Sequence, residues 1–246
     1  MLNQQTQSKL QQLRLSGMAR AYSDQSQQPS MLDLSFDERL GLLVDRELSD
    51  RENRKLDRLI KRAKFRHRAH LEEVDYRSSR GLERNTVAAL STGDWITHRQ
   101  NIIVTGATGT GKSWLACAFG SQACRQGFPV AYKVASTLYE ELRVAMGDGS
   151  LGKYRSALSK IRLLIIDDFG LAPVEQTVGF TLLDIVDQHS QTGSLIITSQ
   201  FPIAVWHRMF NNETLAEAIL DRIVHRAHRI ALKGESMRKR EALPTE

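Results

Sequence analysis

The chain has 246 residues, with 34 lysines and arginines against 28 acidic residues, which gives a formal net charge of +6. Hydrophobic residues make up 41% of the chain, enough for a buried core, and this content excludes an intrinsically disordered protein. The apolar runs are strand-sized, the N-terminus lacks an apolar signal-peptide core, and the two cysteines lie too far apart along one predicted helix to form a disulfide. We therefore expect a cytoplasmic protein that makes no contact with a membrane.

Residues 1–80 predict a helical region, because they contain few glycines and prolines and no β-branched run typical of a strand. Ser35 and Glu38 form a capping box, in which each side chain can bond a free amide at the start of a helix. The apolar face of that helix is predicted to consist of Leu40, Leu43, Val44 and Leu48.

The helix that follows the capping box is predicted to change character over residues 51–70, where nine basic residues stand against two acidic ones, a local net charge of +7. Such a stretch is either a solvated helix face or a ridge that contacts DNA phosphates without reading sequence. An apolar face at Leu56, Leu59, Ile60 and Ala63 would let the helix pack while it presents the ridge. The candidate DNA-binding residues are Arg51, Arg54, Lys55, Arg58, Lys61, Arg62, Lys64, Arg66 and Arg68.

Beyond residue 80, short apolar segments alternate with segments of helical periodicity. The predicted strands are Ile102–Thr105, Val130–Val134, Leu163–Asp167 and Leu195–Ser199. The predicted helices between them are Lys112–Arg125, Thr137–Ala145 and Thr177–Ser190. This alternation is typical of an α/β fold with a parallel sheet that is covered on both faces.

A phosphate-binding loop joins the first of these strands to the first helix. Its sequence satisfies the pattern G-x-x-x-x-G-K-[ST] at every fixed position. Lys112 should reach the β- and γ-phosphates of a nucleotide, and the Ser113 hydroxyl should bind Mg²⁺. The loop therefore predicts binding of ATP and Mg²⁺ through Gly106, Ala107, Thr108, Gly109, Thr110, Gly111, Lys112 and Ser113.

Polar side chains follow two further strands. Asp167 is placed to hold Mg²⁺ and Asp168 to orient or deprotonate an attacking water, although two acids here could also cap the next helix. Gln200 ends the strand at Ile196–Gln200, where it could bond the γ-phosphate or the water.

The ordered series of motifs resembles the AAA+ ATPases, and within them the IstB-type helper ATPases of insertion sequences. The DnaC-type helicase loaders are similar over the ATPase half. The matching segments are LRLSGMARAY, LSFDERLGLLVDREL, GATGTGKSWLACAFGSQACRQG, LLIIDDFG, IITSQFP and ILDRIVHRAHRIALKGESMR.

This resemblance implies a P-loop NTPase core of three αβα layers, after a small all-helical N-terminal domain and without a C-terminal lid. We expect a helical partner- and DNA-binding domain at residues 1–80, an AAA+ ATPase domain at 81–240 and a tail at 241–246. The implied activity is Mg²⁺-dependent, DNA-stimulated hydrolysis of ATP to ADP and phosphate. The implied partners are double-stranded DNA, bound with little sequence preference, a DDE transposase, and further copies of the chain bound through the ATPase domains.

The resemblance also implies that Arg222 acts as an arginine finger in the site of a neighbouring subunit, with Arg226 and Arg229 as competitors. Two departures from the family pattern concern hydrolysis: Asp168 stands where Glu is usual, and Gln200 where many relatives have Asn. Arg238 could replace a lid arginine.

Three hypotheses remain open at this point. The first is an ATP-dependent transposition helper that assembles on target DNA, recruits its transposase and resets by hydrolysis. The second is a replicative helicase loader, which would use the same motor for another client. The third is a nucleotide-gated DNA scaffold with negligible hydrolysis, since the Asp168 side chain is one methylene shorter than Glu.

Overall fold

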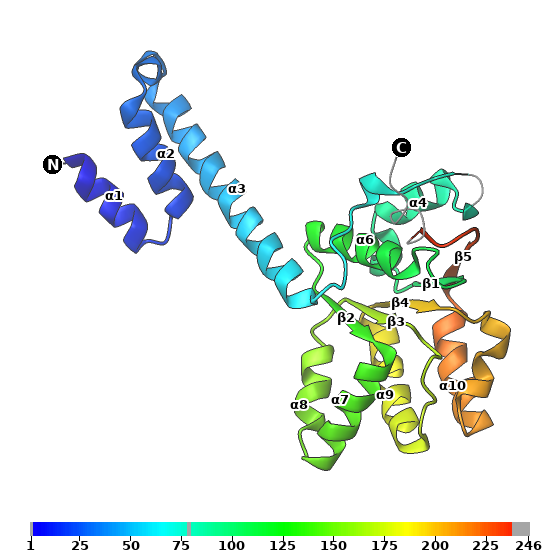
Figure 1. Cartoon of the computed structure of the whole chain (residues 1–246). Coiled ribbons are helices and arrows are strands. Elements are labelled where there is room, and N and C mark those ends of the chain that lie inside the picture. Colours follow the sequence, from blue (N-terminus) through cyan, green and yellow to red (C-terminus); the bar gives the residue numbers. More distant parts are fainter. Residues whose placement is uncertain (1, 78–79, 238–246) are drawn as a thin grey trace. The chain divides into compact units, whose positions relative to one another are not determined.

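The computed structural model describes residues 2–77 and 80–237. The chain divides into two compact units, residues 1–58 and 59–246 (Figure 1). The division falls inside a helix and earlier than the boundary expected at residue 80. Arg238 and the expected tail at 241–246 lie outside the described residues.

The first unit is helical, as expected. It contains α1 (Leu2–Gln12), α2 (Ser16–Gln27), the 3-10 helix η1 (Pro29–Asp33) and most of α3 (Phe36–Ala63). The capping box is confirmed at the start of α3, because the Ser35 amide donates to Glu38 Oε2 at 2.8 Å and the Glu38 amide donates to Ser35 Oγ at 3.3 Å. This reciprocal pair satisfies amides that the helix itself leaves without partners.

A buried carboxylate joins α2 to α3. Glu47 Oε2 accepts hydrogen bonds from the Gly17 amide at 2.8 Å and the Met18 amide at 3.1 Å, both in the first turn of α2. The absent side chain of Gly17 permits this approach, since a Cβ there would lie 2.9 Å from the Arg46 carbonyl oxygen. Burial opposes ionisation of Glu47, but hydrogen bonds from Arg51 and these two amides outweigh it and lower the carboxyl pKa.

Most of the predicted apolar face of α3 is uncovered within the first unit, although Leu43 is half-buried. Leu40, Val44 and Leu48 are exposed, and so is Phe36 at the start of the helix. These four side chains recur every four residues and therefore form one row along the helix surface.

The prediction that the helix after the capping box extends to residue 70 is wrong at its C-terminal end. A single helix, α3, runs through Arg51 and ends at Ala63. Lys64 has a φ of 56°, in the left-handed region, and this breaks the helix. The segment after it continues along the second unit as loop and a 3-10 turn, η2 (Leu71–Glu73).

The second unit is built on a parallel five-stranded sheet in the order β2-β3-β4-β1-β5. The four predicted strands are confirmed, and the alternation with helices places all their carboxyl ends at one edge. The strands are β1 (Asn101–Gly106), β2 (Val130–Val134), β3 (Leu163–Asp167), β4 (Ser194–Ser199) and β5 (Ala227–Leu232).

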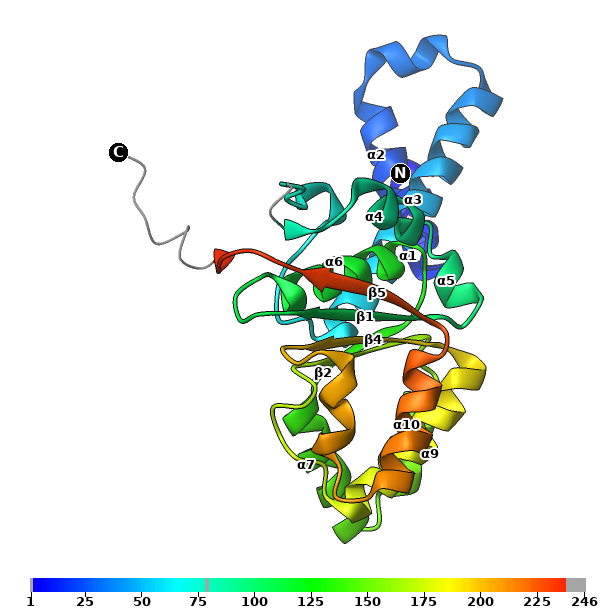
Figure 2. The ribbon, with the colours of Figure 1, turned by 90° about the vertical axis from the view of Figure 1, so that its right-hand side faces the viewer.

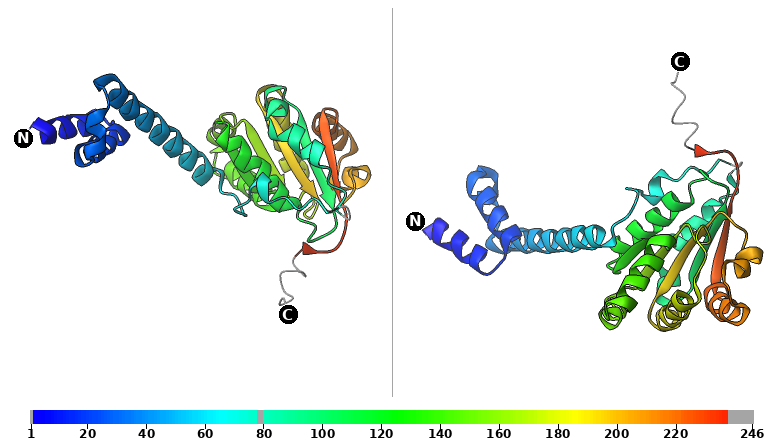
Figure 3. Two further views of the ribbon diagram at one scale, coloured as in Figure 1. Left: turned by 90° about the horizontal axis from the view of Figure 1, so that it is seen from above. Right: turned by 60° about the horizontal axis from the view of Figure 1, so that its bottom comes forward.

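Helices cover both faces of the sheet, which gives the expected αβα layers (Figures 1 and 2). On one face lies α6 (Lys112–Arg125), which contacts β1 to β4, together with α4 (Arg84–Ser91) and α5 (Asp94–Thr97). On the other face lie α7 (Ala135–Gly147), α8 (Leu151–Leu158), α9 (Gln176–Thr192) and α10 (Glu213–Val224). The 3-10 helix η4 (Ile203–Met209) packs against α10, and Figure 3 shows the strands side by side from two further directions.

Strand β5 corrects the expectation that Arg226 and Arg229 follow Arg222 at helical spacing. Helix α10 ends at Val224, Arg226 lies in a turn, and Arg229 belongs to β5, paired in parallel with β1. The partner strand decides the conformation here, because each residue from Ala227 to Leu232 aligns with a residue of β1.

The core of the second unit lies between the sheet and its helices. Strand residues such as Ile103, Ile166 and Ile197 are buried against α7, α9 and α10. Cys117 and Cys124 are buried free thiols on α6, as the sequence predicts, and burial raises the pKa of Cys117 to about 11. Among the described residues, no helix has the length and apolar character needed to cross a membrane.

Candidate nucleotide-binding site

The carboxyl edge of the sheet carries the predicted site. Strand β1 leads into the phosphate-binding loop, β3 into Asp167 and Asp168, and β4 into Gln200. A cavity of about 490 Å³ opens there. Its walls include the predicted residues Thr108, Gly109, Gly111, Lys112, Ser113, Asp168 and Gln200.

Two glycines give the loop its curvature. Gly109 has a φ of 82° and Gly111 a φ of 89°, a region that residues with a Cβ rarely adopt. A Cβ at Gly111 would also lie 2.9 Å from Nη2 of Arg80, which donates to the Thr110 carbonyl at 2.9 Å. Helix α6 begins directly after Gly111, so its free amides face the loop.

Lys112 supplies the cation of the loop. Its side chain is buried, and Nζ donates to the Ala107 carbonyl oxygen at 2.9 Å, across the loop that would surround a phosphate. A buried ammonium, the N-terminus of α6 and the loop amides together form a donor set that fits a polyphosphate.

Asp167 is fully buried and is held by three hydroxyl groups from three elements. Ser113 Oγ of α6 donates to Oδ1 at 2.9 Å, and Thr198 Oγ1 of β4 donates to the same oxygen. The Tyr132 hydroxyl of β2 donates to Oδ2, and burial together with this carboxylate raises the pKa of Tyr132 well above its usual range. The hydroxyl of Ser113 and the carboxylate of Asp167 are oxygen ligands of the kind that Mg²⁺ prefers, so the pair fits that metal.

Asp168 is held in an unusual backbone conformation at the end of β3. Its φ of 58° lies in the left-handed region, and its amide donates to Thr198 Oγ1 at 3.0 Å. The next residue, Phe169, is buried with its ring centroid 4.9 Å from that of Trp206. The turn is therefore fixed on both sides, and the Asp168 carboxylate lines the cavity.

Gln200 reaches the loop directly. Thr108 Oγ1 donates to Gln200 Oε1 at 2.8 Å, which joins the end of β4 to the phosphate-binding loop. The structure thus brings Lys112, Ser113, Asp167, Asp168 and Gln200 together around one cavity.

Sequence reasoning missed several groups at the site. Thr198 and Tyr132 both orient Asp167, and the position of Thr198 near the carboxyl end of β4 could have indicated its role. The segment after α3 also forms part of the cavity wall, and no sequence motif indicated this. This wall contains Arg66, His67, Glu73, Asp75 and Arg80.

Arg222 lies away from this cavity, on α10. Its Nε donates to Asp187 Oδ1 at 2.6 Å and its Nη1 to the Ala218 carbonyl at 2.9 Å. The side chain is about one-third exposed.

The basic residues of the expected ridge fall into three groups. Arg51 and Arg54 bond to Glu47 with distances of 2.7 and 3.4 Å, and Arg66 lies beside the two acids of the cavity. The remaining residues are exposed, four of them on α3: Lys55, Arg58, Lys61, Arg62, and then Lys64 and Arg68.

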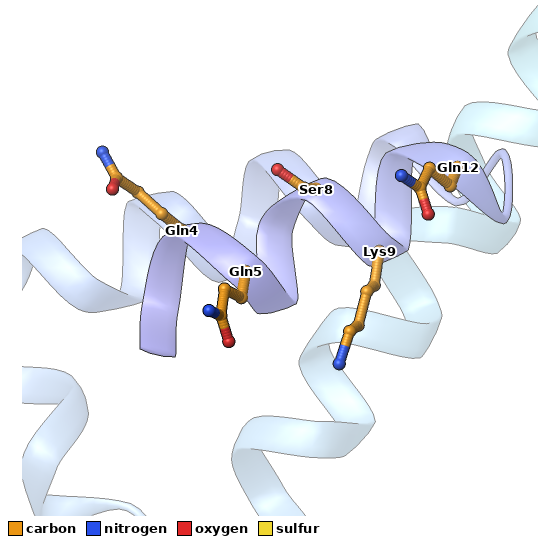
Figure 4. Close-up of a pocket in the computed structure, with 5 residues that line it drawn as sticks. All are labelled: Gln4, Gln5, Ser8, Lys9 and Gln12. Atoms are coloured by element: carbon orange, nitrogen blue, oxygen red, sulfur yellow. The ribbon is translucent and has the colours of Figure 1, made fainter. Parts of the chain in front are cut away.

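A shallow hollow on the first unit carries no site. Its lining consists of neutral polar side chains and one lysine from α1 alone, which project along the helix surface (Figure 4). These residues are Gln4, Gln5, Ser8, Lys9 and Gln12.

Comparison with known proteins gives a consistent result. The model of the family described as IstB-like ATP binding protein matches residues 8–244. An insertion sequence ATP-binding protein of Sinorhizobium fredii is 45% identical over 98% of this chain and 98% of its own length. A protein of Pseudomonas fluorescens named as the ATP-binding protein of insertion sequence IS1162 is 49% identical over 82% of this chain and 88% of its own. Among solved structures, the crystal structure of DnaI superimposes with a TM-score of 0.59 at 18% identity, over 68% of this chain and 92% of that one.

Proposed function

Because the chain belongs to the family of IstB-like ATP-binding proteins, we propose that it is an ATP-dependent helper of DNA transposition. It binds Mg²⁺·ATP in the cavity at the carboxyl edge of the sheet, assembles on double-stranded DNA and recruits a partner transposase of the DDE type. The observation that carries the proposal is the cavity itself, in which the loop, Lys112, Ser113 and Asp168 meet, with the buried Asp167 bonded to Ser113 behind its wall. Full-length relatives named for insertion sequences support the biological setting.

Each polar group of the cavity takes one role in hydrolysis. The loop amides and Lys112 bind the phosphates, and Ser113 with Asp167 holds Mg²⁺, which neutralises charge on the phosphates when bound. Asp168 accepts a hydrogen bond from the attacking water, and Gln200 positions that water or the γ-phosphate. Hydrolysis to ADP and phosphate then resets the assembly on DNA.

Arg222 is proposed to act in a neighbouring copy of the chain. Arg222 does not line the nucleotide cavity of its own subunit, so it can reach a phosphate only across an interface between two ATPase domains. The active form is therefore a homo-oligomer. A guanidinium there stabilises negative charge as the γ-phosphate is transferred. This requires Arg222 to leave Asp187, and exposed ion pairs of this type cost little to break.

We expect Arg222→Ala to retain ATP binding and to lose DNA-stimulated hydrolysis by about 10³-fold, as for other arginine fingers. Phosphate release with Mg²⁺, ATP and duplex DNA measures the effect. Asp187→Asn is the matched control, because it breaks the same ion pair and leaves the guanidinium in place. Equal losses in both variants would assign Arg222 a structural role and remove the finger.

Contacts to DNA are proposed for the exposed basic residues of α3. In the first unit, Lys55 and Arg58 lie on the same side of the helix, since they are three residues apart. Both are exposed and can reach phosphates, whereas Arg51 and Arg54 are partly neutralised by Glu47. Contacts of this kind bind duplex DNA with little sequence preference.

The salt dependence of DNA binding tests this surface. With Lys55→Glu and Arg58→Glu, the slope of log affinity against log salt should fall by about 0.9 for each phosphate that the side chains no longer neutralise. Lys160→Glu, an exposed charge reversal after α8, should leave the slope unchanged. A slope that moves equally in the control and in the α3 variants would place the DNA elsewhere.

Client recruitment is proposed for the exposed apolar row of α3. Phe36, Leu40, Val44 and Leu48 form a surface that water disfavours, and such rows are typical of protein interaction sites. The alternative is a DnaC-like replicative helicase loader, in which the same row would hold a helicase.

Capture of purified clients by the full chain separates these two functions. With duplex DNA and a non-hydrolysable ATP analogue, the chain should retain a purified DDE transposase of an insertion sequence and not the replicative helicase. Leu40→Ser with Val44→Ser should abolish capture, and Leu171→Ser, an exposed apolar position of the second unit, should not. Retention of the helicase alone would establish the loader function instead.

A further inference from the structure

One charged side chain in the cavity has no part in the hydrolysis and binding roles proposed so far. Arg66 follows the end of α3 by three residues, and its Nη1 lies 3.5 Å from Asp168 Oδ2 and 3.9 Å from Asp167 Oδ2. The side chain is 45% exposed and lines the cavity. An arginine beside both acids of a hydrolytic site affects either the acids or the substrate.

The backbone of Arg66 is fixed to helix α6. Phe65 packs against Gly120 so closely that a Cβ on that glycine would lie 2.5 Å from the ring. One turn earlier on α6, the buried Cys117 thiol faces the backbone of Arg66 and His67, which lowers its pKa against the larger effect of burial. The loop after α3 therefore presents Arg66 to the cavity from a defined position.

Arg66 and the magnesium ligands use different oxygens of Asp167. Ser113 donates to Oδ1, whereas Tyr132 donates to Oδ2 and Arg66 approaches that oxygen. A metal on the Ser113 side would therefore leave the Arg66 side of the carboxylate undisturbed.

The contacts of Arg66 with the acids are long. Charge-assisted hydrogen bonds usually span about 2.7–2.9 Å between the heavy atoms. The Arg66 guanidinium lies 3.5 and 3.9 Å from the carboxylate oxygens, so it forms no strong hydrogen bond with either acid. A guanidinium binds phosphate well because its planar donors match two phosphate oxygens. A phosphate that arrived beside Asp168 would be a better partner than either carboxylate.

The other cations of the cavity lie against the phosphate-binding loop. Lys112 donates to the Ala107 carbonyl, and Arg80 donates to the carbonyls of Thr110 and Asp75. Arg66 instead faces Asp168, which in the proposed function marks the γ-phosphate end of the nucleotide.

We propose that Arg66 is a γ-phosphate-binding residue that acts within its own subunit. When a nucleoside triphosphate enters, the guanidinium moves from Asp168 to the γ-phosphate and leaves the carboxylate to the attacking water. A diphosphate has no γ-phosphate and leaves Arg66 on the acids. The end of α3 then responds to the difference between triphosphate and diphosphate. This inference rests on the proposed nucleotide site.

Equilibrium binding of two nucleotides to the full chain tests the proposal. Arg66→Gln should lower the affinity for a non-hydrolysable ATP analogue by about tenfold or more, which is the usual effect of losing a hydrogen bond to a charged group. The affinity for ADP should stay unchanged, and Arg66→Lys should recover part of the loss because it restores the charge. Arg208→Gln, at an exposed arginine of η4 outside the cavity lining, is the matched control and should change neither affinity.

The same titrations in EDTA separate a direct contact from an effect through the metal ligands. A direct contact predicts that the weakening persists without Mg²⁺, and its disappearance would overturn the proposal. The proposal would also be overturned if Arg66→Gln lowered the affinity for ADP equally, or changed neither affinity. Tighter binding of the ATP analogue by Arg66→Gln would overturn it too, because Arg66 would then be blocking the site. Failure of the wild-type chain to bind either nucleotide would instead contradict the proposed function, with Lys112→Ala as the reference for abolished binding.

Discussion

The hydrogen bonding of Asp167 is the constraint on which the site depends. A fully buried carboxylate is costly unless hydrogen bonds replace its water, and here Ser113, Thr198 and Tyr132 do so. These three hydroxyls come from α6, β4 and β2, so satisfying one charge fixes the relative positions of the phosphate-binding loop and two strands. Thr198 Oγ1 also accepts a hydrogen bond from the Asp168 amide, which joins the second acid to the same hydrogen-bond network.

The segment after α3 forms the part of the cavity wall that the sheet edge does not supply. It leaves the helix at Lys64, anchors Phe65 against α6 and supplies Arg66, Glu73 and Asp75 to the cavity wall. Arg80 then bonds to the phosphate-binding loop. The nucleotide site is thus assembled from the sheet edge and from the segment that follows α3.

Local signals predicted the parts of the fold that local sequence determines. The capping box of Ser35 and Glu38, the strands and the loop through Lys112 depend on short spacings, and the structure confirms those elements. The end of α3 and strand β5 could not be predicted in this way, because pairing with β1 and packing of Phe65 on Gly120 come from distant residues. Tyr132 and Arg66 joined the site for the same reason: only the order of the strands and the path of the loop bring them to Asp167.

The central claim is that the cavity hydrolyses ATP and uses Asp168 to do so. The most direct measurement is steady-state phosphate release by the full chain with Mg²⁺, ATP and duplex DNA, for the wild type, Asp168→Asn and Asp184→Asn. Asp184 pairs with Arg155 outside the cavity lining and controls for loss of a charge. If Asp168 acts on the attacking water, only Asp168→Asn loses turnover, by about 10²-fold or more, while it still binds ATP. Equal phosphate release by Asp168→Asn and the wild type, or none by the wild type, would contradict it.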